Sequence, residues 1–594
     1  MDKVSKTINT LKKLFLQDCI LSCGLSGKDS SVVAHCAVEA LKQAKEEKPT
    51  HRGMLYIVTT NTTIDNFEIH NFILQLHEAA REYAKEYDLP IITKELKPKL
   101  FNTPIVEYLG RGKLLRTMQT AARGRDCSVD WKVLPAKEFL SSLAKTHQTD
   151  KVISISGTRD AESAARAKNI AKRGESIDVI VQTDLGLALA PIKDWSTNDV
   201  WSLIGQIEDD VIESFIDIHA AGLRKHYSAG NGGTCDIYFG NSRDVSKSCG
   251  SRFGCTLCSL VESDKSLENQ IEVDPDTYGY MTPFVALRKF MNDTLFDNER
   301  SRSLLGRDVK HGDWIKVGYN QYSLEYRKEL LRYVLTMDAN ERTRAEALGY
   351  APRFELVDYE TLAAIQYHWS REGGESRPAE AIAIWHEVHT YGKRYAIPET
   401  SKTPSQTTVL QFASLNFIAG TGRQDYRYAN LTELDALFDG ERTGLAASAI
   451  DKNLFKCHQT VLDGELALVT PFKETQRNSV DAYLAEQYIN EAYFDLEAEG
   501  AFEPGNDICP TVIIKDMLHN EVITIRKGGM NKLHQDLKRA QTYNAVMKAM
   551  KSGSASLVEN VVLARSITES EFNTRIAEVT DDAEQSAPQM ALGF

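Results

Sequence analysis

The chain has 594 residues, of which 42% are hydrophobic and 26% charged, and a formal net charge of −13. This composition is typical of a globular protein, and the length predicts several domains or one large core with additions. Its ten cysteines are too few for a disulfide scaffold, and the acidic balance means that contact with nucleic acid requires a local basic patch or a partner.

The first residues lack the apolar run and the small-residue cleavage site of a secretory signal. No later stretch has the length and apolar character of a membrane span. We therefore expect a cytoplasmic protein that makes no membrane contact.

Strand-like and helix-like segments alternate over the first 200 residues. Short apolar strands are predicted at residues 18–24, 53–61, 90–96 and 151–157. Helical spacing follows the first strand, an amphipathic helix is predicted over residues 65–87, and Ser196 and Asp199 are spaced as the capping box of another helix. This alternation predicts an α/β fold with a mostly parallel, doubly wound sheet.

The character of the chain changes after the alternating region. A segment rich in Gly, Ser and Cys over residues 227–258 indicates a site built from loops, and helical patterns return over residues 322–395. Residues 396–409 have the composition of a linker, residues 511–526 suggest a hairpin that turns at His519 and Asn520, and the tail from Thr580 is expected to be disordered.

We therefore predict that the chain has four parts, of which the third is helical and the fourth is α+β. They are an N-terminal α/β domain at 1–215, a Cys-rich segment that completes its site at 216–330, a helical region at 331–400, and a C-terminal region of unknown role at 401–594.

The turn "LSGKDS" at residues 25–30 joins the first predicted strand to its helix. Unpaired N–H groups at the helix start and the helix dipole favour an anion there, and glycine lets phosphate approach the backbone. Lys28 adds a charge, Ser30 a hydroxyl, and Asp29 a carboxylate that could help hold Mg²⁺. The spacing excludes a Walker loop, and a plain helix N-cap is the alternative.

The turn resembles the "SGGKDS" loop of the PP-loop ATP pyrophosphatases, specifically the PAPS reductase branch. Leu25 and Ser26 depart from that pattern, whereas the four residues from Gly27 to Ser30 match it. The resemblance implies an adenine-nucleotide α-hydrolase-like fold that cleaves ATP to AMP and pyrophosphate. It implies that Ser26, Gly27, Lys28, Asp29 and Ser30 bind the ATP phosphates.

Further segments match this family in its order. "VTTNT" at 58–62 resembles the strand end that contacts adenosine, which implies roles for Thr60 and Asn61. "GTRDAESAAR" at 157–166 resembles a segment in which Gly157 gives close approach while Arg159 and Arg166 reach phosphate. "APIKDWSTNDVW" at 190–201 resembles a family marker whose tryptophans we expect in the core.

"RDCSVDWKVLP" at 125–135 resembles another segment of the family and places Cys127 in the pattern. Nearby arginines would lower the pKa of its thiol and favour a thiolate. A sulfur-carrying catalytic Cys127 and a semi-buried cysteine near the site remain alternatives.

Four of the ten cysteines are clustered with the spacing C-x13-C-x5-C-x2-C. They are Cys235, Cys249, Cys255 and Cys258. Structural zinc usually has two paired knuckles and only one pair exists here, so four unevenly spaced thiolates favour a [4Fe–4S] cluster, with zinc as the alternative.

"CGSRFGCTLCSLVESDKSLE" at 249–268 resembles the DNA phosphorothioation sulfurtransferases of the DndC and SspD type, over about the first 330 residues. That resemblance implies an enzyme that uses ATP, Mg²⁺ and the cluster to activate a DNA phosphate by adenylation and to replace a non-bridging oxygen by sulfur. The implied partners are DNA, a cysteine desulfurase as sulfur donor and other DNA phosphorothioation proteins.

Three alternatives remain. A sulfonucleotide (PAPS or APS) reductase is one, although its C-terminal "ECGLH"-like segment does not occur here. The others are a PP-loop tRNA thiolase and a non-catalytic, metal-stapled DNA-binding subunit.

A candidate nucleic-acid surface lies in the basic segment 110–126. Its cations are Arg111, Lys113, Arg116, Arg123 and Arg125. Such a patch would make salt-sensitive phosphate contacts, and a solvated helix face is the alternative.

Overall fold

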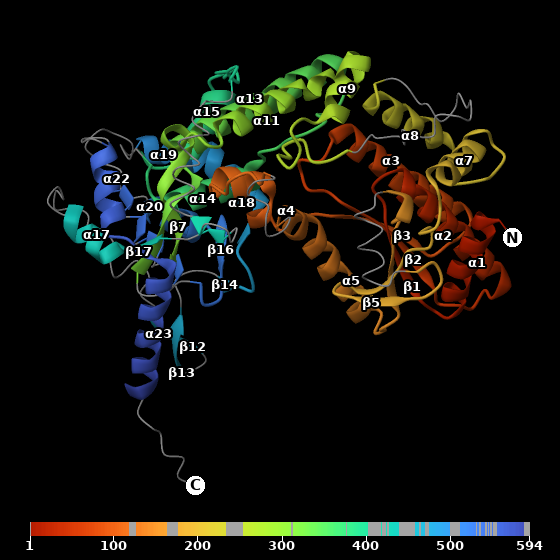
Figure 1. The fold of residues 1–594 in the computed structure, drawn as a ribbon, viewed down its shortest axis with the longest axis horizontal. Helices are drawn as coiled ribbons and strands as arrows, with labels where there is room; N and C mark the ends of the chain where they lie inside the picture. The colour runs from red at the N-terminus through yellow and green to blue at the C-terminus, as the bar shows by residue number, and fades with distance from the viewer. Residues whose placement is uncertain are drawn as a thin grey trace, which may run out of the picture. The chain divides into compact units, whose positions relative to one another are not determined.

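Figure 1 shows the fold of the chain in a computed structural model. It describes residues 2–117, 126–162, 176–232, 253–310, 313–375, 377–401, 417–418, 423–424, 427–438, 458–462, 465–469, 474–498, 511–529, 532–533, 536–537, 539–540, 543–544, 546, 549 and 555–586. The chain forms two compact units: Met1–Pro104 with Arg116–Arg288, and Ile105–Leu115 with Lys289–Phe594. The predicted boundaries after residues 215, 330 and 400 stay predictions.

The first unit is built on a six-stranded sheet in the order β3-β2-β1-β4-β6-β5. Its strands are β1 (Ile20–Gly24), β2 (Met54–Thr60), β3 (Ile91–Leu96), β4 (Val152–Ile155), β5 (Val181–Thr183) and β6 (Gly186–Leu189). All neighbouring pairs are parallel except β5 with β6. The prediction of a mostly parallel α/β sheet is confirmed.

Helices cover both faces of this sheet. The unit contains α1 (Lys3–Leu16), α2 (Lys28–Glu47), α3 (Phe67–Glu86), η1 (Leu100–Asn102), α4 (Asp126–Ser128), η3 (Val129–Val133), α5 (Leu134–Thr146), η4 (Asp160–Glu162), α7 (Thr197–Glu208), α8 (Asp217–Gly230), α9 (Lys265–Val273), α10 (Pro275–Tyr278) and η5 (Gly279–Met281). Residues of α1, α2, α3, α7 and α8 share one apolar core with alternate strand residues.

The opposite face of the sheet carries α5. The strand residues that point to this face, including Ile20, Tyr56 and Val152, form a second apolar cluster with Leu143 and Phe139 of α5. Figure 1 shows α5 across the sheet from α1 and α2. Apolar side chains at alternate strand positions thus face both layers, as a doubly wound sheet requires.

The order of the strands determines where a ligand can bind. From β1 the chain moves outward to β2 and β3, and then returns to place β4 on the other side of β1. In open α/β sheets, ligands bind at the carboxyl ends of the strands where this reversal occurs. The turn after β1 and the turn after β4 therefore meet at the expected binding edge.

The second unit contains a four-stranded sheet in the order β17-β11-β8-β7 and a helical layer. Helix α11 (Thr282–Thr294) begins in the first unit and ends in the second. The other elements are η2 (Val106–Gly110), α12 (Asn298–Ser301), β7 (Arg302–Lys310), β8 (Trp314–Tyr322), α13 (Leu324–Leu348), α14 (Tyr359–Glu372), α15 (Glu380–His389), β9 (Phe417–Ile418), β10 (Arg423–Gln424), β11 (Arg427–Asn430), α17 (Leu431–Phe438), β12 (His458–Leu462), β13 (Glu465–Val469), β14 (Glu474–Thr475), β15 (Ser479–Val480), α18 (Ala482–Gln487), η8 (Tyr488–Ala492), α19 (Tyr493–Ala498), α20 (Thr511–His519), β16 (Ile523–Arg526), α22 (Ala555–Ala564), β17 (Ile567–Thr568) and α23 (Glu569–Ser586).

Helix α13 has clear end signals in its sequence. The side chain of Ser323 accepts a hydrogen bond from the Tyr326 N–H at its start, and Gly349 ends it with a φ of 70°, a left-handed conformation that suits glycine. Helices α13, α14 and α15 confirm the helical pattern over residues 322–395.

The hairpin predicted over residues 511–526 is wrong. Residues Thr511–His519 form helix α20, and only Ile523–Arg526 form a strand. The buried side chains of Ile513, Ile514, Met517 and Leu518 recur at helical spacing, so burial on one face outweighed the β-branched composition. Helix α23 also continues past Thr580 to Ser586, where a disordered tail was expected to begin.

Most of the predicted linker at 396–409 lies outside the described residues. Among the described helices, none is both long enough and apolar enough to cross a membrane.

Candidate functional site

The predicted phosphate loop lies between β1 and α2. The N–H groups of Ser26 and Gly27 donate to the Ser30 hydroxyl oxygen at 2.8 and 3.0 Å, and that hydroxyl donates to the Gly27 carbonyl at 2.8 Å. Ser30 and Gly27 are thus joined in a closed hydrogen-bonded turn at the start of the helix. Successive N–H groups held in this way form an anion-binding arrangement.

Leu25, which departs from the family pattern, has a structural role. Its side chain is buried in the core of the unit, and its N–H donates to the Val58 carbonyl of β2 at 2.6 Å. The leucine side chain therefore packs the loop onto the core, and the backbone donors of Ser26 and Gly27 stay in place.

Asp29 connects two cations of the predicted site. One carboxylate oxygen lies 2.7 Å from Lys28 Nζ, and the other lies 2.9 Å from Arg159 Nε. The Arg159 guanidinium is buried and also donates to the Trp195 carbonyl at 3.2 Å and to the Thr197 hydroxyl at 3.4 Å. Three predicted residues from two strand ends are therefore joined in one network.

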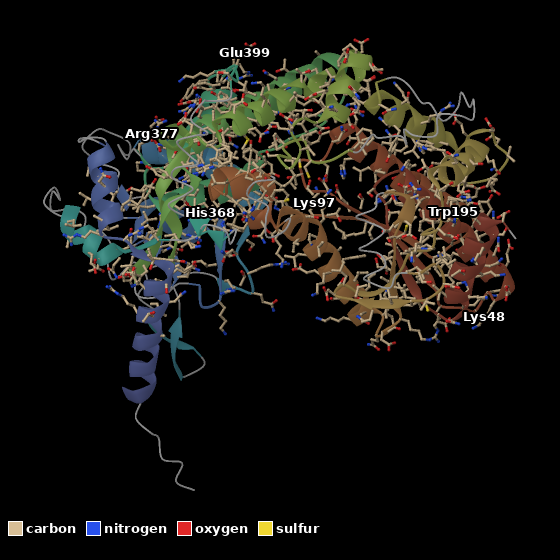
Figure 2. The ribbon with its side chains drawn as sticks, in the orientation of Figure 1. Lys48, Lys97, Trp195, His368, Arg377 and Glu399 are labelled. Atoms are coloured by element: carbon tan, nitrogen blue, oxygen red, sulfur yellow. The ribbon has the colours of Figure 1, made fainter. Side chains whose placement is uncertain are left out.

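Trp195 and Trp201 both belong to the apolar core, as predicted for the family-marker segment. Figure 2 labels Trp195 among the side chains of the first unit. The Ser196 and Asp199 capping box that opens α7 is also present. The marker segment thus supplies the Trp195 carbonyl that accepts from Arg159, and it packs helix α7 into the core.

Gly157 lies directly against the phosphate loop. A Cβ atom on this residue would be 2.8 Å from the Asp29 carbonyl carbon and 2.8 Å from the Ser30 nitrogen. The residue lets the turn after β4 approach the backbone of the phosphate loop. The close approach predicted for Gly157 is therefore, in this structure, an approach to the loop itself.

Tyr227 of α8 belongs to the site although no sequence motif indicated it. The Lys28 N–H donates to its hydroxyl at 3.3 Å, and Lys28 Nζ lies 5.5 Å from the centre of its ring. The ring also packs edge-on against Phe253 at a centroid distance of 5.2 Å. Because Tyr227 is 199 residues from Lys28, no local pattern in the chain could indicate this contact.

The end of β2 holds the predicted adenosine-contacting residues, Thr60 and Asn61. The Asn61 amide donates to the Glu95 carboxylate at 2.7 Å, and His70 Nε2 lies 2.8 Å from the same oxygen. The hydrogen bond to His70 and then that to Asn61 outweigh the opposing effect of burial and lower the pKa of Glu95 to about 2. The side chain of Asn61 is thereby oriented by a fixed carboxylate.

Cys255 and Cys258 lie beside the loop that follows β2. Asp65 and Cys255 form an isolated β-bridge, and the Cys255 thiol lies 3.6 Å from the Asp65 carboxylate and 3.6 Å from the Thr62 hydroxyl. The Cys258 N–H donates to the Cys255 carbonyl at 3.0 Å, so the pair forms a tight turn. The Cys-x2-Cys pair and the phosphate loop therefore flank the same edge of one sheet.

Lys132 links the segment that carries Cys127 to Asp65, beside Cys255. Its ammonium lies 3.1 Å from the Asp65 carboxylate, and the Asp65, Cys255 and Cys127 charges raise its pKa against the opposing effect of burial. Burial, and then the Asp65 charge, raise the pKa of the Cys255 thiol to about 12. The candidate relay Cys127 is half-buried in this electrostatic group.

Cys235 and Cys249 lie outside the described residues, as do Arg123, Arg125 and Arg166. Within the described ranges, no three His, Cys, Asp or Glu side chains gather as a metal site. The described pair, Cys255 and Cys258, fits half of a four-thiolate set in donor chemistry and spacing.

The described cations of the basic segment divide between the two units. In the second unit, Arg111 and Lys113 both pair with the buried Glu107 carboxylate, at 2.6 and 2.9 Å. Arg116 belongs to the first unit. The charges of two members of the predicted patch are thus shared with an internal carboxylate.

No curated protein matches the chain. Residues 20–213 match the phosphoadenosine phosphosulfate reductase domain, a span that contains the sheet, the phosphate loop and the Arg159 network. This region of the chain is therefore similar to the PP-loop and PAPS reductase family of nucleotide-binding enzymes of sulfur metabolism.

Proposed function

We propose that the protein is an ATP-dependent sulfurtransferase that installs phosphorothioate linkages in DNA. One observation carries the proposal: a PP-loop phosphate site and a Cys-x2-Cys pair flank the same edge of one sheet. The phosphate site would bind the ATP that activates the DNA phosphate, and the cysteine pair would serve the sulfur chemistry.

In the proposed reaction, a DNA phosphate oxygen attacks the α-phosphorus of ATP, and pyrophosphate leaves. The phosphate oxygen then leaves as part of AMP when a sulfur nucleophile attacks the DNA phosphorus. If that sulfur is the outer atom of a Cys127 persulfide, a thiol reductant must then cleave the S–S bond to Cys127 to release the phosphorothioate. The loop N–H groups and Lys28 bind the ATP phosphates, Arg159 orients Asp29, and Asp29 is the candidate Mg²⁺ ligand.

Cys255 and Cys258, with Cys235 and Cys249, would hold a [4Fe–4S] cluster that supplies sulfur or electrons. Lys132 offsets negative charge beside this pair, and Cys127 is the candidate sulfur relay. Iron and acid-labile sulfide in anaerobically purified protein would support this part, and zinc without sulfide would contradict it.

A second candidate is reduction of a sulfonucleotide, which the domain match favours equally. Both reactions use a nucleotide at the same loop, but they differ in products. The sulfurtransferase releases AMP and pyrophosphate from ATP, whereas the reductase releases sulfite from PAPS or APS.

The deciding experiment measures phosphorothioate dinucleotides by mass spectrometry of nuclease-digested host DNA. Deletion of the gene, or Lys28→Ala or Ser30→Ala, should abolish them, because each variant removes a phosphate contact of the loop. Glu78→Gln, a change of an exposed carboxylate on α3, should leave them at the wild-type level. Normal levels in the deletion strain contradict the proposal, and sulfite release from PAPS or APS would replace it by the reductase reading.

A further inference from the structure

Tyr227 places its hydroxyl over the phosphate loop. The Lys28 N–H donates to this hydroxyl at 3.3 Å, and a Cβ atom on Gly27 would lie 2.6 Å from it. The hydroxyl therefore accepts from an N–H group that the proposed function assigns to phosphate. A phosphate oxygen that binds beside this N–H can accept a hydrogen bond from the same hydroxyl.

The ring of the same residue contacts the segment that carries the cysteines. Tyr227 packs edge-on against Phe253 at 5.2 Å and against Trp201 at 5.6 Å between ring centroids. Phe253 stands two residues before Cys255. One buried side chain thus contacts the phosphate loop with its hydroxyl and the Cys-bearing segment with its ring.

The segment that follows Phe253 is fixed at its other side to the loop after β2. The Asn66 N–H donates to the Gly254 carbonyl at 3.2 Å, and the Thr256 N–H donates to the Ile64 carbonyl at 2.7 Å. This loop continues from the predicted adenosine-binding strand end. Residues 253–256 therefore contact that side of the site directly and the phosphate loop only through Tyr227.

We propose that Tyr227 is a positioning residue that couples phosphate binding at the Lys28 amide to the conformation of the Cys255–Cys258 turn. The inference rests on the proposed function only in assuming that an adenine nucleotide binds at the loop. A shift of the hydroxyl moves the ring, and the packed contact with Phe253 transmits the shift because close-packed aromatic side chains do not deform independently. By linkage, the state of the cysteine turn changes nucleotide affinity by the same factor.

The test uses Tyr227→Phe in the full chain, which removes the hydroxyl and keeps the ring. Tyr83→Phe is the matched control, because Tyr83 lies on α3 in the same unit and the change removes a phenol hydroxyl that donates to Glu213. Phe253→Leu interrupts the contact from the other end. ATP affinity is measured by equilibrium dialysis, and hydrogen–deuterium exchange of residues 25–31 and 253–258 is followed with and without Mg-ATP.

We expect ATP to slow exchange at both segments in the wild type and in Tyr83→Phe. Tyr227→Phe should bind ATP roughly three- to tenfold more weakly, as expected for one lost hydrogen bond. At saturating ATP it should keep the slowing at residues 25–31 and lose it at 253–258. Phe253→Leu should also lose the response at 253–258, and its ATP affinity should change by no more than that of Tyr227→Phe, because it removes the coupling but keeps the hydroxyl.

An unchanged response of residues 253–258 in Tyr227→Phe would overturn the inference and leave the proposed function standing. The same measurements with PAPS separate the two ideas further. A Tyr227 effect seen with PAPS in a chain that does not bind ATP supports the coupling and contradicts the sulfurtransferase. Wild-type protein that binds neither nucleotide overturns both.

Discussion

Glu95 is the side chain through which the predicted adenosine end of the site is held. Its carboxylate is shared by Asn61 and His70. The sequence selected Asn61 by its motif but gave no reason to select Glu95, which stands 34 residues further along the chain on an otherwise ordinary strand. A residue that orients a site residue through a hydrogen bond leaves no spacing signal.

Glu95 should also make stability depend on pH. Its pKa in the folded protein is about 2, below the ordinary value of 4.5, so its stabilising contribution is complete above pH 4.5 and is lost as the pH falls toward 2. Glu95→Gln should lower the free energy of unfolding at pH 7 by about 1.5–3 kcal/mol, the range for hydrogen bonds to a charged group.

The difference in unfolding midpoint between wild type and Glu95→Gln should narrow as the pH falls below 4.5. Chemical denaturation at a series of pH values measures it, with Glu78→Gln as the exposed control. A difference that stays constant down to the lowest accessible pH would contradict the assigned role of the carboxylate.

At the scale of elements, the site depends on how closely the turn after β4 approaches the start of α2. The two strands β1 and β4 are paired in parallel, so both turns leave the same edge of the sheet. Gly157 makes the approach possible, and the Arg159–Asp29 pair closes it at 2.9 Å. The geometry of the phosphate loop is thus a property of two elements.

Gly157→Ala should therefore disrupt nucleotide binding. The added methyl group would lie 2.8 Å from backbone atoms of Asp29 and Ser30, which cannot move aside as a flexible side chain can. We expect at least a tenfold loss of ATP affinity, measured by equilibrium dialysis, with little change in secondary structure.

Gly279→Ala is the matched control, since the nearest atom to its added methyl group is 4.0 Å away. Equal ATP affinity in Gly157→Ala and the control would show that the loop tolerates displacement of its backbone. Loss of binding in both would indicate a general effect of the substitution.

At the scale of the whole molecule, the second unit includes a short segment from the first third of the chain. Residues Ile105–Leu115 belong to it, and the Trp369 indole donates to the Leu109 carbonyl at 2.7 Å. Arg327 donates to the Gly110 carbonyl at 2.5 Å, and Val106 and Leu109 are buried. No single cut of the chain can therefore separate the two units with their cores complete.

A chain that ends at residue 288 should consequently aggregate or bind hydrophobic dyes. It would keep the β1–β6 sheet but expose Val106 and Leu109, whose partners lie in α13 and α14. Size-exclusion chromatography and dye fluorescence test this, with a chain that ends at residue 586 as the control. A monodisperse, nucleotide-binding chain of residues 1–288 would contradict it.

The amino-acid sequence by itself determined four of the six strands of the first unit, β1 to β4, together with the capping box of α7 and the glycine-containing turn at residues 25–30. It did not predict β5 and β6. Strand periodicity, end caps and the glycine-containing turn are local properties, so they can be recognised without knowledge of the fold. The same reasoning failed at residues 511–519, because β-branched residues form a strand or a helix according to what buries them.

Only the tertiary structure decided which side chains surround the loop. Lys28 meets Tyr227 across 199 residues, and Asp65 meets Cys255 across 190. These contacts arise because parallel strands bring their carboxyl ends to one edge, where segments distant in sequence converge. The spacing of residues along the chain predicts local contacts, such as those within a helix or a turn. The contacts that complete this site join segments far apart in the sequence, so residue spacing cannot predict them.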